Sequence, residues 1–454
     1  MFLRGLNNLV ELDLSGTAIK ILDFKTMVVQ VPRLKRLYLI GCKQLRAIIF
    51  LHDIHSSKVE PDLELMSIDT RAGIVCPRAS IDKTKSFRLR VHAIVVDARL
   101  IHSVGSLTHM KDVPYNIHVT SSPAYDGVVQ FEETNNGKFD HCDQGSLEQL
   151  IPAVQYGDVL SMVCNPPMQA FLQPPATRLD AHIEIAKGSY YVESGLKGVL
   201  GYLMGETSKS LHLHDVSIDA IIPRTQHYTW NNLRWCRVER CPKLDTVFPS
   251  VSSAFPSNSS GFFKLETFWA SDLLMARWIW SKGRLHGSFS LSDTNSFKNL
   301  QHLHLRSCPR LQFVIPVWVC SFPKLETLHI IHCGDLVHVF ELDELYPKEI
   351  FSLGVLFPKL TTMHLHDLPK LQQICEVKMV APALETIKIR GCWGLRRLPS
   401  VAARRQGEKK PTVEIEKDMW DALEWDANHR PDHFEAPVHS RHFKKKLPRV
   451  SFLR

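Results

Sequence analysis

The sequence predicts an α/β solenoid in which a parallel β-sheet forms the concave face and irregular helices and loops cover the convex face. Two observations predict this fold. A pattern of apolar residues with a cysteine at a fixed offset recurs five times in the chain of 454 residues. Several neighbouring copies are 25 residues apart, as at 12 to 37, 211 to 236 and 303 to 328. Units of this length must stack, because one unit alone cannot bury its apolar side.

The repeated pattern is the leucine-rich-repeat signature L-x-x-L-x-L-x-x-N/C-x-L, which predicts a leucine-rich-repeat horseshoe. Successive side chains of a strand point to opposite faces, so the two central apolar residues of each copy should point inward. The five copies with cysteine are Leu34, Leu37, Leu39, Cys42, Leu45; Leu233, Cys236, Val238, Cys241, Leu244; Leu300, Leu303, Leu305, Cys308, Leu311; Leu325, Leu328, Ile330, Cys333, Leu336; and Leu384, Ile387, Ile389, Cys392, Leu395.

Further copies lack the cysteine, and one of them, at Leu265 and Phe268, is degenerate. We therefore expect the solenoid to span residues 1–400, with degenerate repeats at about 46–205. The inward pairs expected in the less regular part are Met66/Ile68, Ile94/Val96, Ile117/Val119, Leu160/Met162 and Ile183/Ile185.

The last repeat of a solenoid exposes an apolar edge and unpaired backbone groups, so a terminal element has to cover it. We expect residues 401–430 to form this carboxy-terminal cap, with a closing strand at Val413 and Ile415, and with Trp420, Leu423 and Trp425 over the core. Residues 431–454 should form a basic, flexible tail. The apolar run at Trp278–Trp280 should pack as a helix on the convex side.

Composition favours an ordinary soluble protein, with 44% hydrophobic and 22% charged residues. The net charge of +8 is too small for a nucleic-acid footprint. No apolar run approaches the roughly 18 residues that cross a membrane, and the start carries no signal peptide. We expect a cytoplasmic protein with reduced cysteines, with the nucleus as an alternative because of the basic run at 441–449.

The face of the sheet opposite the leucines should carry the binding site. Aromatic residues and arginine are enriched at binding hot spots, and solenoids commonly bind partners on the concave surface. We therefore expect an acidic protein patch to bind there. The candidate partner-binding residues are Tyr38, Trp235, Arg237, His302, His304, Arg306, His329, His364, His366, Lys388 and Arg390.

Three alternatives concern the same residues. The face could be a solvated polar surface without a partner. His304, His329 and His364 could hold a zinc ion, but no short fixed spacing supports this, so no metal is predicted. Nucleic-acid binding through the basic face and tail would make binding strongly salt-dependent.

Catalysis is not expected, and neither is a cofactor. The segments Leu211–Asp215 and Met363–Asp367 each contain histidine beside aspartate. Side chains alternate between the two faces of a strand, so the repeat already places these histidines outward beside inward apolar residues. No serine elbow, H-E-x-x-H motif or paired C-x-x-C motif occurs in the sequence.

The phrases at Phe322–Leu328 and Phe357–Leu360, and the cap at Val413–Trp425, resemble the carboxy-terminal repeats of grass-type plant intracellular nucleotide-binding leucine-rich-repeat disease-resistance proteins. The resemblance implies a sensor region that takes part in the defence response. Its partners would be a pathogen effector or a guarded host protein and, in the full receptor, its own nucleotide-binding module.

The chain departs from that family in having no phosphate-binding G-x-x-x-x-G-K-[ST] run; the nearest phrase is Asn136–Phe139. ATP binding is therefore not expected of these residues. Because Leu3, Leu6 and Leu9 begin in the middle of the repeat pattern, we expect further sequence upstream. The alternative function is a stand-alone leucine-rich-repeat scaffold or adaptor that recruits a protein partner.

Overall fold

The computed structural model describes residues 6–24, 31, 33–49, 63–70, 90–96, 100–101, 114–119, 181–188, 199–221, 228, 230–248, 261–280, 296–317, 322–342, 354–401, 409–425 and 433–439. The chain divides into two compact units. The amino-terminal unit comprises residues 1–184 and 188–191, and the carboxy-terminal unit comprises residues 185–187 and 192–454. Among the described residues, no helix is long and apolar enough to span a membrane.

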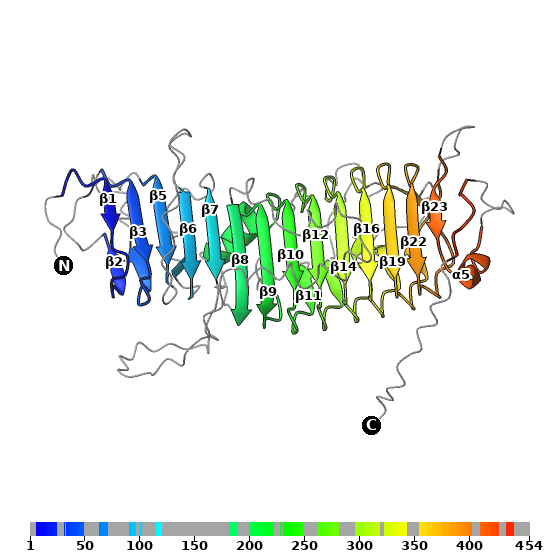
Figure 1. Ribbon diagram of the computed structural model, residues 1–454, viewed down its shortest axis with the longest axis horizontal. Coiled ribbons are helices and arrows are strands. Elements are labelled where there is room, and N and C mark those ends of the chain that lie inside the picture. The colour runs from blue at the N-terminus through cyan, green and yellow to red at the C-terminus, as the bar shows by residue number, and fades with distance from the viewer. Residues whose placement is uncertain are drawn as a thin grey trace, which may run out of the picture. The chain divides into compact units, whose positions relative to one another are not determined.

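The amino-terminal unit is built on a sheet whose strands follow one another in chain order (Figure 1). In sheet order the strands are β1 (Glu11–Asp13), β3 (Arg36–Ile40), β5 (Leu65–Asp69), β6 (Arg90–Val95), β7 (Tyr115–Val119) and β8 (Ala181–Gly188). Each pair from β1 to β7 is parallel. A smaller parallel pair joins β2 (Ile21–Asp23) to β4 (Ala47–Ile49).

The inward residues of this unit agree with the sequence at most positions. Met66, Ile117 and Ile183 are fully buried, and Ile68 and Ile185 are 2% exposed or less. The prediction of Ile94/Val96 was wrong by one residue, because Val91, Ala93 and Val95 are buried in β6 and the described Val96 is not. Val96 is 38% exposed. The pair Leu160/Met162 lies outside the described residues.

The carboxy-terminal unit repeats the same arrangement with clearer periodicity (Figure 1). Its main sheet contains, in order, β9 (Ser210–Val216), β10 (Trp235–Glu239), β12 (Thr267–Ser271), β14 (His302–Arg306), β16 (Thr327–Ile331), β19 (Thr362–His366), β22 (Thr386–Arg390) and β23 (Thr412–Glu414). All neighbouring pairs are parallel. The predicted parallel leucine-rich-repeat solenoid is therefore confirmed.

Few helices accompany these strands in the described ranges. They are α4 (Val199–Tyr202), the short π-helical turn η4 (Leu203–Thr207) and α5 (Lys417–Asp421). Short parallel strands form additional small sheets: β11 (Thr246–Phe248) with β13 (Trp278–Trp280); β15 (Ile315–Val317), β17 (His338–Leu342) and β20 (Gln373–Cys375); and β18 (Val355–Leu356) with β21 (Met379–Val380). The predicted helix at Trp278–Trp280 was therefore wrong.

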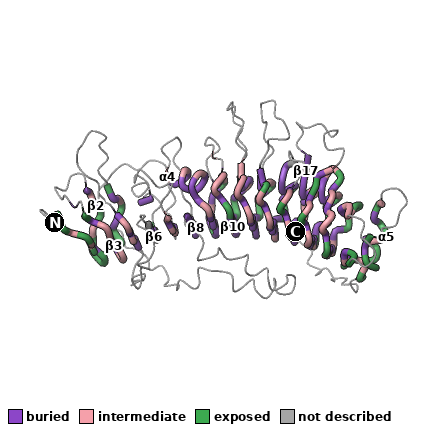
Figure 2. The backbone as a smooth tube through the Cα atoms, turned by 90° about the horizontal axis from the view of Figure 1, so that it is seen from above, coloured by how far each residue is buried: buried purple, intermediate pink, exposed green. Residues whose placement is uncertain are grey.

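The core of the carboxy-terminal unit lies on the leucine side of the main sheet. The buried runs recur from turn to turn (Figure 2). Every central inward residue of the repeats is 2% exposed or less: Leu211, Leu213, Cys236, Val238, Phe268, Ala270, Leu303, Leu305, Leu328, Ile330, Met363, Leu365, Ile387 and Ile389. In-register pairing explains this continuity, because Leu303 lies opposite both Phe268 and Leu328.

The cysteine position has a defined role in the turn that follows each strand. The residue before the cysteine adopts a positive φ at Gly41, Arg240, Ser307, His332 and Gly391. This turns the chain away from the strand direction, and each of the five cysteines is fully buried. The thiol then hydrogen-bonds a backbone carbonyl, as from Cys308 Sγ to Arg306 O at 3.4 Å and from Cys42 Sγ to Leu14 O at 3.2 Å.

The cysteines behave as buried thiols rather than disulfide partners. All seven cysteines within the described ranges are free of disulfides. Burial raises the pKa of Cys241 and of Cys392 to about 12. Both thiols therefore stay protonated near neutral pH and act as small hydrogen-bond donors.

Aromatic residues precede β10, β12, β14, β16 and β19 at one fixed position. Trp230, Phe262 and Phe297 lie three positions before the first leucine of their repeats and stack with interplanar angles of 5° and 7°. Phe322 and Phe357 occupy the same position and stack at 5.1 Å. Each aromatic carbonyl accepts a hydrogen bond from the leucine that follows, as Phe297 O does from Leu300 N at 3.1 Å. In the Phe-Pro-Lys-Leu segments the phenylalanine therefore has two roles. Its carbonyl closes the turn before the strand, and its ring stacks on the ring of the neighbouring repeat.

Gly391 is a position where the turn requires glycine. Its φ is +66°, and a Cβ there would lie 2.6 Å from Asp367 Oδ1. A non-glycine residue in this region costs roughly 1–2 kcal/mol before any clash is counted. We expect Gly391→Ala to lower the free energy of unfolding by about 2–3 kcal/mol, measured by urea denaturation followed by tryptophan fluorescence.

Gly334→Ala is the matched control for this prediction. The nearest atom to a Cβ there is Pro309 O at 3.7 Å, which is an ordinary contact. We expect this variant to remain within about 0.5 kcal/mol of the wild type. Equal losses in both variants would show that the turn geometry at Gly391 is not the cause.

The carboxy-terminal end of the sheet is closed by β23, which pairs with β22 where a closing strand was expected. Val413 and Ile415 are 1% exposed or less, and Leu423 is buried. Trp420 and Trp425 are half-buried and contact each other at 5.2 Å between ring centroids. Phe434 joins this aromatic group at 6.4 Å from Trp420. Nothing beyond residue 439 lies in the described ranges, so the predicted flexible tail falls outside them.

Candidate functional site

The candidate site lies on the face of the main sheet that points away from the leucines. We call it the polar face and define it in the carboxy-terminal unit by three in-register columns. The central column is His212, Arg237, Trp269, His304, His329, His364 and Lys388; the column before it is Ser210, Trp235, Thr267, His302, Thr327, Thr362 and Thr386; the column after it is His214, Glu239, Ser271, Arg306, Ile331, His366 and Arg390.

The structure thus brings ten of the eleven predicted residues onto one face of this unit. Tyr38 is the exception, because it belongs to the amino-terminal unit. There it occupies the equivalent column of β3, opposite Asp13 on β1 and Ser67 on β5. Tyr38 is 7% exposed, so it is largely covered by its own neighbours.

The central column forms a continuous stack. The Arg237 guanidinium carbon lies 5.8 Å from the centroid of the Trp269 ring, and that ring lies 5.3 Å from His304. His304 is 5.2 Å from His329, and His329 is 4.2 Å from His364. These spacings follow from the strand separation of about 4.8 Å, which places each ring against the next. The last three residues form the histidine ladder.

The stack excludes water more thoroughly than its polar composition suggests. His304 and His364 are 2% exposed, and Arg237 is 4% exposed. Large side chains in register cover one another, so a column that looks solvent-facing in the sequence becomes a second packed layer. Parallel sheets are commonly buried on both faces.

Burial makes the histidine ladder neutral at physiological pH. Desolvation lowers the pKa of His304 to about 3, with smaller contributions from His302 and His364. Desolvation also lowers the pKa of His364 to about 4, and it holds the pKa of His329 far below the usual range. Both ring nitrogens of His304 and of His364 lack a hydrogen-bond partner in the described structure. The ladder is therefore polar but uncharged, which is costly to bury.

A buried carboxylate balances the arginine at the other end of the stack. Glu239 is fully buried and accepts hydrogen bonds from Arg237 at 2.8 Å and from His212 at 3.2 Å. Arg240 Nη1 lies 3.4 Å from the same carboxylate. Burial alone would raise the pKa of Glu239, but the His212 hydrogen bond and the two arginines outweigh it and lower the pKa to about 2.

The accessible charged and histidine side chains of the polar face lie on β14, β19 and β22. We call Arg306, His366, Lys388 and Arg390 the rim, because all four are partly exposed whereas the rest of the predicted set is buried. Desolvation lowers the pKa of His366 to about 4, so His366 is neutral at pH 7. The positive charge of the rim therefore comes from Arg306, Lys388 and Arg390.

Residues 274–407 match the family model described as plant disease resistance protein RPS2-like, leucine-rich repeats. These residues are similar to leucine-rich repeats of the plant disease-resistance type. The matched disease-resistance repeats contain the histidine ladder and the whole rim. Trp235, Arg237 and Tyr38 lie outside the match.

Curated relatives agree with this assignment of the repeats. The chain is 29% identical over 130 residues to the probable disease resistance protein At5g47260 of Arabidopsis thaliana. The aligned region covers 29% of this chain and 13% of that protein. It is 29% identical over 146 residues to the Arabidopsis disease resistance protein SUMM2, covering 31% of this chain and 16% of SUMM2. The matches to these relatives thus span less than a fifth of their length. No solved structure matches the chain.

The zinc alternative for the ladder of these disease-resistance repeats is not supported by the geometry. In the described part of the chain, His304, His329 and His364 do not place three donor atoms within 4.8 Å of one another. The rings stack along the sheet instead of converging on one point.

The sequence interpretation missed Trp269 on the polar face and the ion pairs of Glu239. Trp269 sits between Arg237 and His304, but its repeat has Phe268 and Ala270 in place of leucines, which hid the strand. Its position was recoverable from Leu265, because the strand starts two residues after the first leucine in every clear repeat. Glu239 was placed in a column, but its buried ion pairs could not be seen from spacing.

Proposed function

We propose that this chain is the protein-recognition region of a plant immune receptor that acts in the defence response. The observation that carries the proposal is the match of residues 274–407 to plant disease-resistance repeats, which include the histidine ladder and the rim. The region binds proteins and carries out no catalysis itself. It works in the cytoplasm, and in the full receptor it also contacts the nucleotide-binding module.

The rim is the part of the polar face that we assign to the partner. Arg306, Lys388 and Arg390 are accessible, while the packed column behind them holds the strands at a fixed spacing. A rigid array of cations favours an acidic surface, because the ordering entropy has already been lost on folding. We therefore propose an acidic patch on a pathogen effector or on a guarded host protein as the ligand.

The test reverses the charge of the rim. We expect the triple variant Arg306→Glu, Lys388→Glu, Arg390→Glu to bind its plant protein partners with at least about tenfold lower affinity. This corresponds to about 1.4 kcal/mol of binding free energy. The measurement is quantitative mass spectrometry of proteins captured by the tagged chain, followed by titration of the enriched partner at two salt concentrations. Binding of the wild-type chain should weaken as salt rises.

A control variant carries the same change of charge elsewhere. Arg310, Lys359 and Lys370 are exposed and lie in turns outside the polar face. Arg310→Glu, Lys359→Glu, Lys370→Glu should keep the partners. If both triple variants lose the same partners, or if neither does, the rim is not the binding surface.

A further inference from the structure

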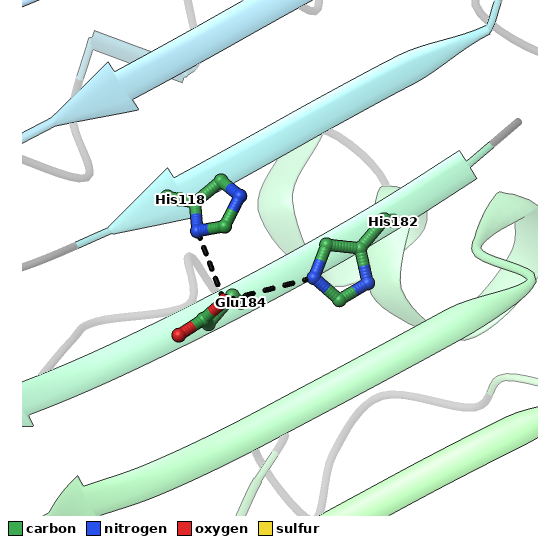
Figure 3. A group of neighbouring side chains, drawn as sticks. All are labelled: His118, His182 and Glu184. Carbon is green, nitrogen blue, oxygen red and sulfur yellow. Dashed lines mark ion pairs between the residues drawn. The ribbon is translucent and has the colours of Figure 1, made fainter. Parts of the chain in front are cut away.

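Three side chains of the amino-terminal unit converge away from the residues considered so far. They are His118 on β7 and His182 and Glu184 on β8 (Figure 3). His118 Nδ1 lies 3.0 Å from Glu184 Oε2, and His182 Nε2 lies 3.8 Å from the same oxygen. One donor atom from each residue lies within 4.8 Å of the other two.

The sheet explains why these three residues meet. His182 and Glu184 are two positions apart on one strand, so both side chains point to the same side of β8. β7 is the neighbour of β8 in the sheet, and His118 points toward the pair from there (Figure 3). The two histidine rings lie 5.5 Å apart at an interplanar angle of 61°. The rings are therefore turned edge to face.

The separations fit a tetrahedral zinc ion. Zinc binds imidazole nitrogen and carboxylate oxygen at about 2.0–2.2 Å, which places tetrahedral donors about 3.3 Å apart. The two measured separations to Glu184 Oε2, 3.0 Å and 3.8 Å, fall on either side of that value. Movements of a few tenths of an ångström would bring each nitrogen to the expected separation from Glu184 Oε2.

Glu184 Oε2 is the common neighbour of both imidazoles. The contact of His118 with Glu184 at 3.0 Å has an ordinary hydrogen-bond length, whereas the 3.8 Å of His182 Nε2 is longer than one. Both imidazoles nonetheless aim at one oxygen atom (Figure 3). Two imidazole nitrogens and one carboxylate oxygen thus lie close enough together to be ligands of a single ion.

We propose that His118, His182 and Glu184 bind a zinc ion that joins β7 to β8. Two histidines and one glutamate form an established ligand set for zinc, and three protein ligands leave one position for water or for an outside donor. The His118 side chain is 31% exposed and that of Glu184 is 17% exposed, so an ion can reach the site.

The ion would act as a clip on the amino-terminal unit. His118 and His182 are 64 residues apart in the chain (182 − 118), so a bond through zinc closes a long loop. Closing a long loop restricts the unfolded chain more than closing a short one. The inference is independent of the proposed partner-binding function, since it concerns other residues in the other unit.

The experiment titrates the full chain with zinc chloride by calorimetry, and with Co²⁺ as a spectroscopic probe of tetrahedral geometry. We expect one zinc ion to bind per chain, and this binding should require His118, His182 and Glu184. His118→Asn and His182→Asn should each weaken that binding by more than the 10–100-fold that is typical for loss of a supporting residue. His118→Cys, which retains a zinc donor, should restore most of the affinity.

His332→Asn is the matched control, because His332 forms a histidine–carboxylate pair with Asp367 at 3.0 Å in the other unit. It should bind zinc like the wild type. Hydrogen exchange of the unmodified chain gives a readout that does not require a variant to fold. Zinc should slow exchange in β7 and β8 relative to a chelator. Absence of binding, unchanged binding in both asparagine variants, or unchanged exchange in β7 and β8 would each overturn the proposal.

Discussion

Replacing Glu239 with alanine is expected to lower the free energy of unfolding of the carboxy-terminal unit by about 3–5 kcal/mol. The carboxylate is fully buried and pairs with Arg237, which is itself 4% exposed. Removing the carboxylate leaves the guanidinium buried against Trp269 without its counter-charge. A buried charge that loses its partner is far more costly than a missing surface ion pair.

Urea denaturation monitored by tryptophan fluorescence would measure this effect. All nine tryptophans lie between residues 230 and 425, so the signal reports on the carboxy-terminal unit. The exposed pair of Lys370 and Asp335 supplies the control, and Asp335→Ala should change stability by less than about 1 kcal/mol. The double variant Arg237→Met, Glu239→Leu should recover most of the loss, because it removes both charges. If Glu239→Ala lowered the free energy of unfolding no more than Asp335→Ala does, the assigned role of Glu239 would be wrong.

Acidification is expected to destabilise the same unit between pH 6.5 and about pH 4. The histidines of the ladder have folded pKa values below the ordinary 6.5, with His304 at about 3 and His364 at about 4. The unfolded state therefore binds more protons than the folded state in this window, and stability falls as the pH falls. The full stability is present above pH 6.5. At pH 5 each such histidine contributes a loss on the order of 2 kcal/mol.

The double variant His304→Leu, His364→Leu isolates this contribution. It should flatten the dependence of stability on pH between 7 and 5, and it should raise stability at pH 7 because the unpaired ring nitrogens are gone. Glu239 does not affect the measurement between pH 7 and 5. Its pKa is lowered to about 2, so its contribution to stability is lost only below pH 4.5. His332→Leu, at an exposed histidine, is the control. An unaltered pH profile in the ladder variant would show that other groups cause the acid sensitivity.

The fold was predictable because the repeat links two independent patterns. The leucine columns and the buried cysteines share one period, and strand alternation then places His304, His329 and His364 in one column. Errors arose where alternation was ambiguous. Residues 93–96 are all apolar, so within them Ile94/Val96 was not distinguished from Ala93/Val95. Trp278–Trp280 is too short and too apolar for its period to separate strand from helix.

The properties of the site were less predictable than its location. Register could be inferred from the sequence, but the burial of the polar face depends on the combined size of neighbouring side chains. Trp269 shows this, because it closes the gap between Arg237 and His304 from a repeat that the pattern barely revealed. The meeting of His118 with Glu184 depends on two strands whose sequence separation follows no period. Spacing along the chain carries no signal for such a contact.

The strands of the main sheet pair in one constant register. A whole turn can therefore be removed or exchanged while the leucine positions stay aligned. His329 pairs with His304 on one side and His364 on the other, although 25 residues (329 − 304) separate the first pair and 35 residues (364 − 329) the second. Removal of the turn that carries β14 would place Trp269 opposite His329, with leucine positions still facing leucine positions. Unequal recombination between repeats can therefore alter the row of side chains offered to a partner while preserving the core. A recognition surface built in this way can diversify by exchange of turns as well as by point substitution.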